Sequence, residues 1–434
     1  MPPSPLPKAG PKAVVAAAVV GNTLEVFDFI AYGTYAVMIG RAFFPVHDAV
    51  LSLLLSVSTF GVGFITRPLG ALLIGAYADR RGNRSGMMLS LALMGLGSLM
   101  IALLPTYHAI GLAAPLLLVL ARLIQGIAWG GEAGPATLFL LDAAAPGHEG
   151  FMVSWQGVSQ AGAVLLSGLT GVLITSVIGD AALSAWGWRI PFVLGMLVVP
   201  VGLWLRRGLP PAIAPAPMTG MVPPHEVTKQ PTLARVLVCG FLLMTGGTVT
   251  QYFLNFSTSY ALTVLHLPIR NALMVSVAIG IAAVLAALAG GLLCDRIGSR
   301  AVIIWPRLAI GLLIVPGLWL ATSAGSTALF VLFCAMVAAL QASSFVASLV
   351  LMIRSLPPSR RTMRFGMVYA VSIAVFGGTA QIVFVDLIRW TGSAIAPGWY
   401  LAIVNLVCVV AALGLPEIRP ERVSFLSGQN LGRL

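Results

Sequence analysis

Two acidic residues, Glu25 and Asp28, lie inside the first long apolar stretch of this 434-residue sequence. They are three residues apart, so a helix carries both side chains on one face. That face lies about 18 Å from the start of the stretch, at 1.5 Å per residue. A buried carboxylate is costly unless it binds a proton or pairs with a cation. A group that does both in turn couples proton binding to another event, and a permanent ion pair is the alternative.

Arg122 is the cation best placed to partner such an acid or an anionic ligand. It lies in another apolar stretch, with Gln125 and Trp129 at helical spacing on the same face. Arginine keeps its charge, and its planar fork suits a carboxylate. We therefore expect Arg122 to bind a ligand carboxylate, and a static pair with Glu25 or Glu132 is the alternative.

Arg67 is a second internal cation. It precedes Asp79 by a stretch that is about 18 Å long as a helix, which places it at nearly the depth of Glu25. The Arg67 and Glu25 side chains are expected either to exchange partners or to form a structural pair. Uncharged polar residues at helical spacing would orient an oxygen-rich anion, although such groups also join helices in membranes. They are Gln156, Gln160, Gln251, Tyr252 and Asn255.

The composition predicts that these residues belong to a polytopic, all-α membrane protein. The chain is 59% hydrophobic and only 9% charged, which is far more apolar than an average soluble domain. A spanning helix needs roughly 20 apolar residues, and charged, Pro-rich or Gly-rich breaks divide the chain into twelve candidates. They lie near residues 13–40, 50–77, 87–105, 112–141, 151–178, 189–206, 233–264, 271–293, 301–321, 326–352, 365–389 and 397–415.

A repeated motif, G-x-x-x-D-R-x-G-x-R, divides the chain into two similar halves. One copy runs from Gly75 to Arg84 and the other from Gly291 to Arg300. Each copy ends one apolar stretch and begins the next, so each marks a short turn at the membrane surface, where charges cost little. The acids are expected to cap an opposing helix or to bind an arginine, and so to stabilise one access state. The motif residues given this gating role are Asp79, Arg80, Arg84, Asp295, Arg296 and Arg300.

The halves and their connections follow from the breaks between the apolar stretches. The expected segments are an N-terminal tail 1–12, a six-helix bundle 13–206, a Pro-rich linker 207–232, a second six-helix bundle 233–415 and a C-terminal tail 416–434. Most Lys and Arg residues fall on the side of the tails and the linker, whereas the other side receives Arg41, Arg270 and Arg389. Both termini and the linker are therefore predicted to be cytoplasmic.

The same sequence disfavours other functional classes. None of the three lysines, Lys8, Lys12 and Lys229, follows a glycine, so the phosphate-binding loop of an ATPase is absent. The four cysteines form no C-x-x-C pair and the five histidines are scattered, so no metal or other cofactor is expected. The cations are spread over short loops, which does not suit nucleic acid. No nucleophile stands with a histidine and an acid at a spacing that would suit an enzyme.

The duplicated motif resembles the signature of the major facilitator superfamily. Further blocks resemble its metabolite:proton symporter family: Gly21-Asn22-Thr23-Leu24-Glu25-Val26-Phe27-Asp28-Phe29, Arg67-Pro68-Leu69-Gly70, Arg122-Leu-Ile-Gln125-Gly126, Gly130-Gly131-Glu132 and Ala396-Pro397-Gly398-Trp399-Tyr400. Three blocks are most similar to the citrate and tricarballylate carriers: Ser154-Trp155-Gln156, Ser159-Gln160 and Trp186-Gly187-Trp188-Arg189-Ile190-Pro191-Phe192.

This resemblance implies two six-helix bundles that form an alternating-access symporter, present as a monomer in the inner membrane. It implies proton-coupled import of a small carboxylate, with citrate, tricarballylate or a related di- or tricarboxylate as the expected substrate. Spans one, four, five and seven are expected to line the cavity, which adds Asn22 and Tyr32 to the substrate residues. Glu25, Asp28 and Glu132 are the candidate proton carriers. The alternatives are the same fold with another solute, such as shikimate, oxoglutarate or an osmolyte, and a nutrient receptor that does not transport.

Two loops depart from the family pattern in the sign of their charges. His148 and Glu149 stand where the family has a basic pair, and Arg354 stands where it has an acid. We therefore predict a rewired cytoplasmic gate in which Glu149 and Arg354 are partners. Arg307, inside the ninth stretch, has no partner that the sequence identifies.

Overall fold

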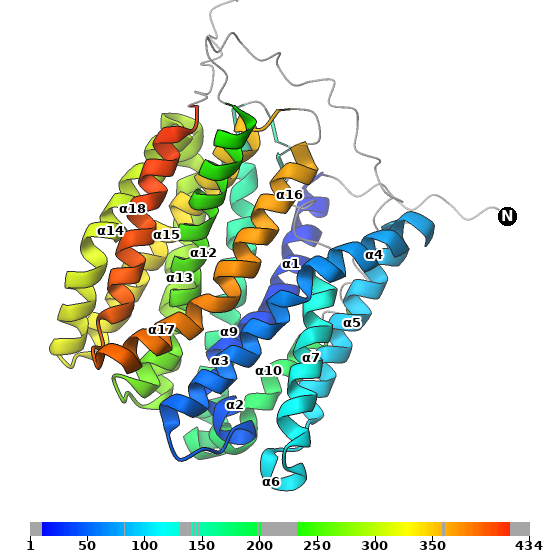
Figure 1. Ribbon diagram of the computed structural model, residues 1–434, viewed down its shortest axis with the longest axis vertical. Helices are drawn as coiled ribbons and strands as arrows, with labels where there is room; N and C mark the ends of the chain where they lie inside the picture. The colour runs from blue at the N-terminus through cyan, green and yellow to red at the C-terminus, as the bar shows by residue number, and fades with distance from the viewer. Residues whose placement is uncertain are drawn as a thin grey trace, which may run out of the picture.

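The computed structural model of the protein describes residues 11–81, 83–130, 137, 140–141, 144–145, 147–197, 199–200, 232–357 and 361–416, and long helices run side by side through this part of the chain (Figure 1). Nine helices among the described residues are long and apolar enough to cross a membrane, and Met88–Leu103 is a shorter apolar helix. The predicted all-helical membrane fold is confirmed. The tails and the linker lie largely outside the described residues, so their boundaries stay predictions.

The described residues of the first half form ten helical elements: α1 (Pro11–Thr34), α2 (Ala36–Phe43), α3 (Ala49–Ile65), α4 (Arg67–Arg81), α5 (Asn83–Leu103), α6 (Tyr107–Ile110), α7 (Ala113–Gly130), α9 (Glu149–Ala185), the 3₁₀ turn η1 (Gly187–Arg189) and α10 (Ile190–Gly195). The stretch predicted at 13–40 is interrupted at Tyr35, and the stretch at 50–77 is interrupted at Thr66. The second break has a local cause, because Pro68 cannot donate a backbone hydrogen bond to the preceding turn. This break puts Arg67 at the start of α4.

The second half contains α12 (Leu233–Thr263), α13 (Ile269–Ile297), α14 (Ser299–Ser323), α15 (Thr327–Ser355), α16 (Arg361–Ser372), the π-helical turn η2 (Ile373–Gly377), α17 (Gly378–Thr391) and α18 (Ala396–Gly414). These bounds match the predicted stretches to within a few residues. The turn between α13 and α14 falls at Gly298, whose φ of 92° favours glycine, as the second copy of the repeated motif predicts.

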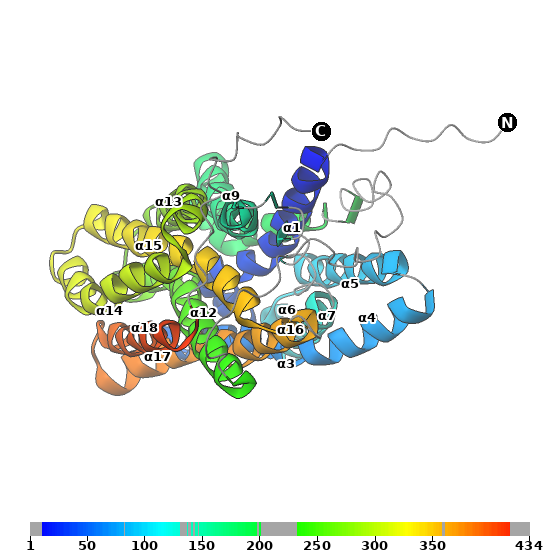
Figure 2. The same cartoon turned by 90° about the horizontal axis from the view of Figure 1, so that it is seen from above.

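The two halves meet along helices that are far apart in the sequence. α9 packs along α13, α17 packs along α3, and α1 contacts α12. Figure 2 shows α9 beside α13 when the bundle is seen from above. The starts of α1, α12 and α16 and the end of α18 lie at one end of the bundle, whereas α6 lies at the other end (Figure 1). The centre of the molecule is thus enclosed by helices from both halves.

Close packing of α7 against α3 and α4 depends on glycines. A Cβ atom on Gly126 would clash with the carbonyl oxygen of Gly63, and one on Gly130 would clash with that of Arg67. Small residues at a helix crossing let the backbones approach, which is the main source of attraction between helices in lipid. This packing brings Arg122 of α7 next to the chain around Arg67.

Candidate functional site

Arg122, Gln125 and Asp28 form a continuous chain of hydrogen bonds inside the first half. Nη1 of Arg122 donates to Oε1 of Gln125 over 2.7 Å, and Nε2 of Gln125 donates to Oδ2 of Asp28 over 2.5 Å. The Gln125 amide also lies 3.3 Å from the hydroxyl of Ser98. The side chains of Arg122, Gln125 and Asp28 are all buried, and the exposed fractions of Arg122 and Asp28 are 0%. The amide therefore links a buried cation to a buried acid that do not touch directly.

Aromatic rings from α1 and α3 surround the guanidinium of Arg122. Its Cζ lies 4.5 Å from the ring centre of Tyr32, 4.7 Å from that of Phe29 and 5.1 Å from that of Phe60. Ring faces attract a cation by about 0.5–2 kcal/mol each, more strongly where water is excluded. They stabilise the charge without using its hydrogen-bond donors.

Arg67 occupies a similar setting and shares the ring of Phe29 with Arg122. Its Cζ lies 3.7 Å from the ring centre of Trp129, 4.0 Å from that of Phe64 and 4.9 Å from that of Phe29. Tyr252 of α12 packs its ring against Phe64, with centres 5.5 Å apart. The two arginines and their rings are called the aromatic cage below, and its second-half wall is Tyr252.

Several donors of the aromatic cage are unused. Nε and Nη2 of both Arg67 and Arg122 are buried and have no hydrogen-bond partner among the described residues. The acceptor Oδ1 of Asp28 is likewise buried without a partner there. Buried N–H groups of a guanidinium are rarely left unpaired because their desolvation costs several kcal/mol. Two buried arginines with open donors, of which Arg122 is linked to an acid, form a site that favours an anion.

The remaining predicted substrate residues lie around this centre with partners of their own. The amide of Asn22 donates to the Ser159 hydroxyl over 2.5 Å, and the Tyr32 hydroxyl donates to the Ser56 carbonyl over 3.2 Å. Gln251 donates to Asn255 over 3.2 Å. Thr137 donates to Gln156. The first two bonds join α1 to α9 and α3, the Gln251–Asn255 bond lies within α12, and Gln160 is partly exposed.

The candidate proton carriers are not equally placed. Glu25 is buried on α1, one turn before Asp28, and is engaged in an interaction within the chain. Glu132 lies outside the described residues. Asp28 is the acid that the structure connects to Arg122.

At the end of the bundle where α9 begins, the gating residues of the second half come together. The carboxylate of Asp295 accepts hydrogen bonds from the backbone amides of Gly150, at 2.6 Å, and Phe151, at 2.8 Å. Nη2 of Arg354 lies 2.7 Å from Oε1 of Glu149. The predicted pairing of Glu149 with Arg354 is therefore present. These contacts join α9 of the first half to α13 and α15 of the second half.

The other motif residues whose side chains the structure describes, Arg80, Arg296 and Arg300, do not share these contacts. Arg300 donates to the carbonyl of Leu415. Arg80 and Arg296 are exposed, and the side chains of Asp79 and Arg84 lie outside the part of the chain that the structure describes. A gating role for these five residues stays a prediction.

Three kinds of residue in or near the cage were not predicted as site residues. Gln125 bridges Arg122 and Asp28, and its position three residues after Arg122 was the available signal. Phe60 and Phe64 precede Arg67 at spacings that place all three on one helix face, a signal that could have identified the ring stack. Gln381 of α17 is buried and its amide has no partner among the described residues. A Cβ on Gly33 of α1 would lie 3.6 Å from that amide. Because α1 and α17 are far apart in the sequence, no local pattern could have identified Gln381 as a neighbour of α1.

Arg307 of the second half, for which the sequence identified no partner, has hydrogen-bond acceptors in the structure. It is fully buried, and its Nη1 donates to Oδ1 of Asn405 over 3.0 Å and to the carbonyl of Gly246 over 3.3 Å. Gln341 donates to the neighbouring carbonyl of Gly247 over 2.8 Å. The two glycines belong to α12, so side chains from α14, α15 and α18 converge on one turn of that helix.

Comparison with known proteins agrees with this architecture. The sequence profile of the Major Facilitator Superfamily matches residues 21–371. A citrate-proton symporter of Salmonella typhi is 36% identical over 98% of both chains, and an alpha-ketoglutarate permease of Escherichia coli strain K12 is 33% identical over 91% of both. The crystal structure of a D-xylose-proton symporter superposes with a TM-score of 0.73 at 16% identity, over 94% of this chain and 98% of the other, which shows a shared fold.

Proposed function

This chain belongs to the major facilitator superfamily of membrane transporters, and from that premise we propose that it is a symporter that imports a di- or tricarboxylate together with protons. The relatives named citrate-proton symporters are 33–36% identical to it, which supports citrate or tricarballylate as the substrate. The function is transport, and no covalent chemistry is involved.

One observation carries the proposal: the aromatic cage holds two arginines with unused donors, and one of them is linked through an amide to a buried acid. Nε and Nη2 of Arg122 have no hydrogen-bond partner among the described residues, while Nη1 reaches Asp28 through Gln125. A planar carboxylate suits the free edge of Arg122, and Arg67 offers a second cation to a second carboxylate. The cage thus favours a substrate with more than one negative charge.

The Gln125 bridge also provides a physical route to proton coupling. With the cage empty, the positive field of Arg122 favours the ionised form of Asp28. A substrate carboxylate bound to Arg122 neutralises that field, so the affinity of Asp28 for a proton rises. By reciprocity a protonated Asp28 raises the affinity for the anion by the same factor. Substrate and proton are therefore taken up together.

The contacts at the start of α9 fit a closed gate. Asp295 caps the first turn of α9, where the helix dipole favours a carboxylate, and Glu149 pairs with Arg354 beside it. The excess of cations on this side of the membrane assigns it to the cytoplasm. The described conformation is then closed on its cytoplasmic side, and release of the substrate requires these contacts to break.

Uptake by purified protein in lipid vesicles tests the proposal. We expect labelled citrate or tricarballylate to accumulate when a proton gradient is directed inward, and only to equilibrate when the gradient is collapsed. Vesicles that hold the Arg122→Gln variant are the control for leakage. Failure of the wild-type protein to accumulate either anion under a gradient would overturn the assignment.

The alpha-ketoglutarate permease, at 33% identity, supports a second candidate substrate with two carboxylates. Competition against labelled citrate separates the candidates. Because both arginines of the cage are expected to engage carboxylates, unlabelled dicarboxylates and tricarboxylates should compete better than monocarboxylates of similar size.

A further inference from the structure

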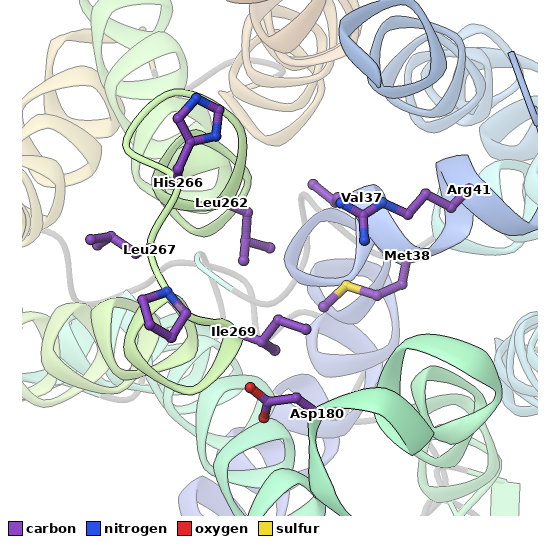
Figure 3. Close-up of a pocket in the computed structure, with 9 residues that line it drawn as sticks. Val37, Met38, Arg41, Asp180, Leu262, His266, Leu267 and Ile269 are labelled. Atoms are coloured by element: carbon purple, nitrogen blue, oxygen red, sulfur yellow. The ribbon is translucent and has the colours of Figure 1, made fainter. Parts of the chain in front are cut away.

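A cavity of about 400 Å³ lies between the two halves at the end of the bundle away from the Glu149–Arg354 pair. Glu149 begins α9, and Asp180, which directly follows the kink at Gly179 near the end of α9, lines the cavity. Figure 3 shows the side chains that surround it. They come from α2 and α9 of the first half and from the end of α12, the α12–α13 connection and the start of α13 in the second half.

Three groups in this cavity carry or can carry charge: Arg41, Asp180 and His266. In Figure 3 the guanidinium of Arg41 points from α2 toward the α12–α13 connection, and the carboxylate of Asp180 points toward the same connection. All three residues are exposed, and the structure shows no hydrogen bond or ion pair that would occupy them among the described residues. The two nitrogen-bearing groups come from opposite halves.

The backbone of His266 is held in an unusual conformation. Its φ of 50° is the one positive value at a non-glycine among the described residues. A side chain in the left-handed region costs roughly 1 kcal/mol and persists only where the surroundings hold it, often at functional positions. The connection therefore presents His266 at a fixed place in the mouth of the cavity.

The cavity leads toward the aromatic cage along matching turns of two helices. Val37 and Leu262 line the cavity. One turn deeper, the hydroxyl of Ser259 lies 3.5 Å from the carbonyl oxygen of Gly33, so α1 and α12 touch there. A further turn along α1 is Phe29, which belongs to the cage. The contact between α1 and α12 at Gly33 and Ser259 lies between the cavity and the cage on this path.

We propose that this cavity is an outer docking site for a di- or tricarboxylate anion, which Arg41 and His266 hold before it passes between α1 and α12. The inference rests on the proposed function, because it concerns the route of the same substrate. The two donors bridge the halves, so an anion between them stays at the seam that must open. Asp180 repels the anion and exposed charges are screened, which keeps docking weak enough for onward movement.

Initial uptake rates in vesicles test this site. Arg41→Gln should raise the KM for the transported carboxylate about fivefold, the size expected for one exposed charge, with the maximal rate unchanged. Arg389→Gln is the matched control, because it removes the same charge from an exposed position at the end of α17 on the same side. It should leave KM unchanged. Asp180→Asn should lower KM, since it removes a repulsive charge.

His266→Asn removes the imidazole but keeps the backbone conformation, because asparagine tolerates a positive φ. It should raise KM in the same direction as Arg41→Gln. The proposal is overturned if the wild-type protein accumulates carboxylate but Arg41→Gln and Arg389→Gln have the same KM, or if Asp180→Asn raises KM. Absence of uptake by the wild-type protein would instead count against the proposed function.

Discussion

Arg122 and Arg307 are both fully buried arginines in membrane-spanning helices, yet their surroundings differ in kind. Arg122 is enclosed by ring faces and reaches an acid through Gln125, which leaves two of its nitrogens without partners in the described chain. Arg307 donates to Asn405 and to a carbonyl of α12, and no ring face is recorded against it within the described residues. Nε and Nη2 of Arg307 also lack partners in the described chain, so the two arginines differ in what surrounds them, ring faces and an amide-linked acid against neutral acceptors, and not in their free donors.

The comparison suggests that the same buried charge performs two tasks. In the first half, we propose, it forms a ligand site that is linked through Gln125 to the acid Asp28. In the second half it holds the Gly246–Gly247 turn of α12 against its neighbours. A buried cation by itself is therefore a poor guide to function, and the kind of partner decides.

The strongest test of this contrast is Arg122→Lys. Lysine keeps the charge but loses the planar fork, whose Nη1 reaches Gln125 while its other edge suits a carboxylate. We expect the loss of about 3 kcal/mol of substrate binding, or roughly 100-fold in uptake at limiting substrate. Vesicle uptake with matched protein amounts measures it, and wild-type rates in the lysine variant would break the comparison.

Asp28→Asn is expected to have the next largest effect on transport. It removes the acid that distinguishes the surroundings of Arg122 from those of Arg307, which contacts no acid among the described residues. Asparagine keeps the hydrogen bond with Gln125 but cannot exchange a proton. Gradient-driven accumulation should fall to a ratio of about one, while exchange of external for internal substrate continues and no longer depends on pH. Proton-driven accumulation at the wild-type ratio would exclude Asp28 as the coupling acid.

Arg307→Gln should affect stability instead of affinity. Loss of the buried bonds to Asn405 and Gly246 is expected to lower the free energy of unfolding by about 1–3 kcal/mol. Thermal unfolding in detergent measures this, and the KM for substrate should stay within about twofold, as expected for a residue outside the site. Asn405→Leu is the matched variant, because it removes the Arg307–Asn405 bond from the acceptor side. A large rise in KM with unchanged thermal stability would assign Arg307 to the substrate site.

The smallest effect is expected at a third arginine, Arg354, whose pair with Glu149 is about one-fifth exposed on either side. Such a pair contributes about 0.2–1 kcal/mol. Single charge reversals, Glu149→Arg and Arg354→Glu, should each slow transport severalfold, and the double reversal should restore it. A double variant as slow as the singles would show that the pair does not stabilise the gate.

Much of this arrangement follows from local sequence. The density of apolar residues predicts spanning helices, and the second motif copy places a turn at Gly298, where the structure has one. The pairing of Glu149 with Arg354 was predictable because both loops depart from the family pattern with opposite sign. Glu25, Asp28, Arg67 and Arg122 stand out because charges within apolar stretches are costly and rare.

What the sequence by itself determined is therefore the set of elements and the identity of the buried charges. Which atoms meet was decided only by the tertiary structure. The Gln125 bridge to Asp28, the rings shared by Arg67 and Arg122, and the clamp of Arg307 on α12 all join helices that are distant in the chain. Helical periodicity defines the face of one helix, but a contact between helices depends on their spacing and rotation, which the glycine crossings and the packing of both halves set together.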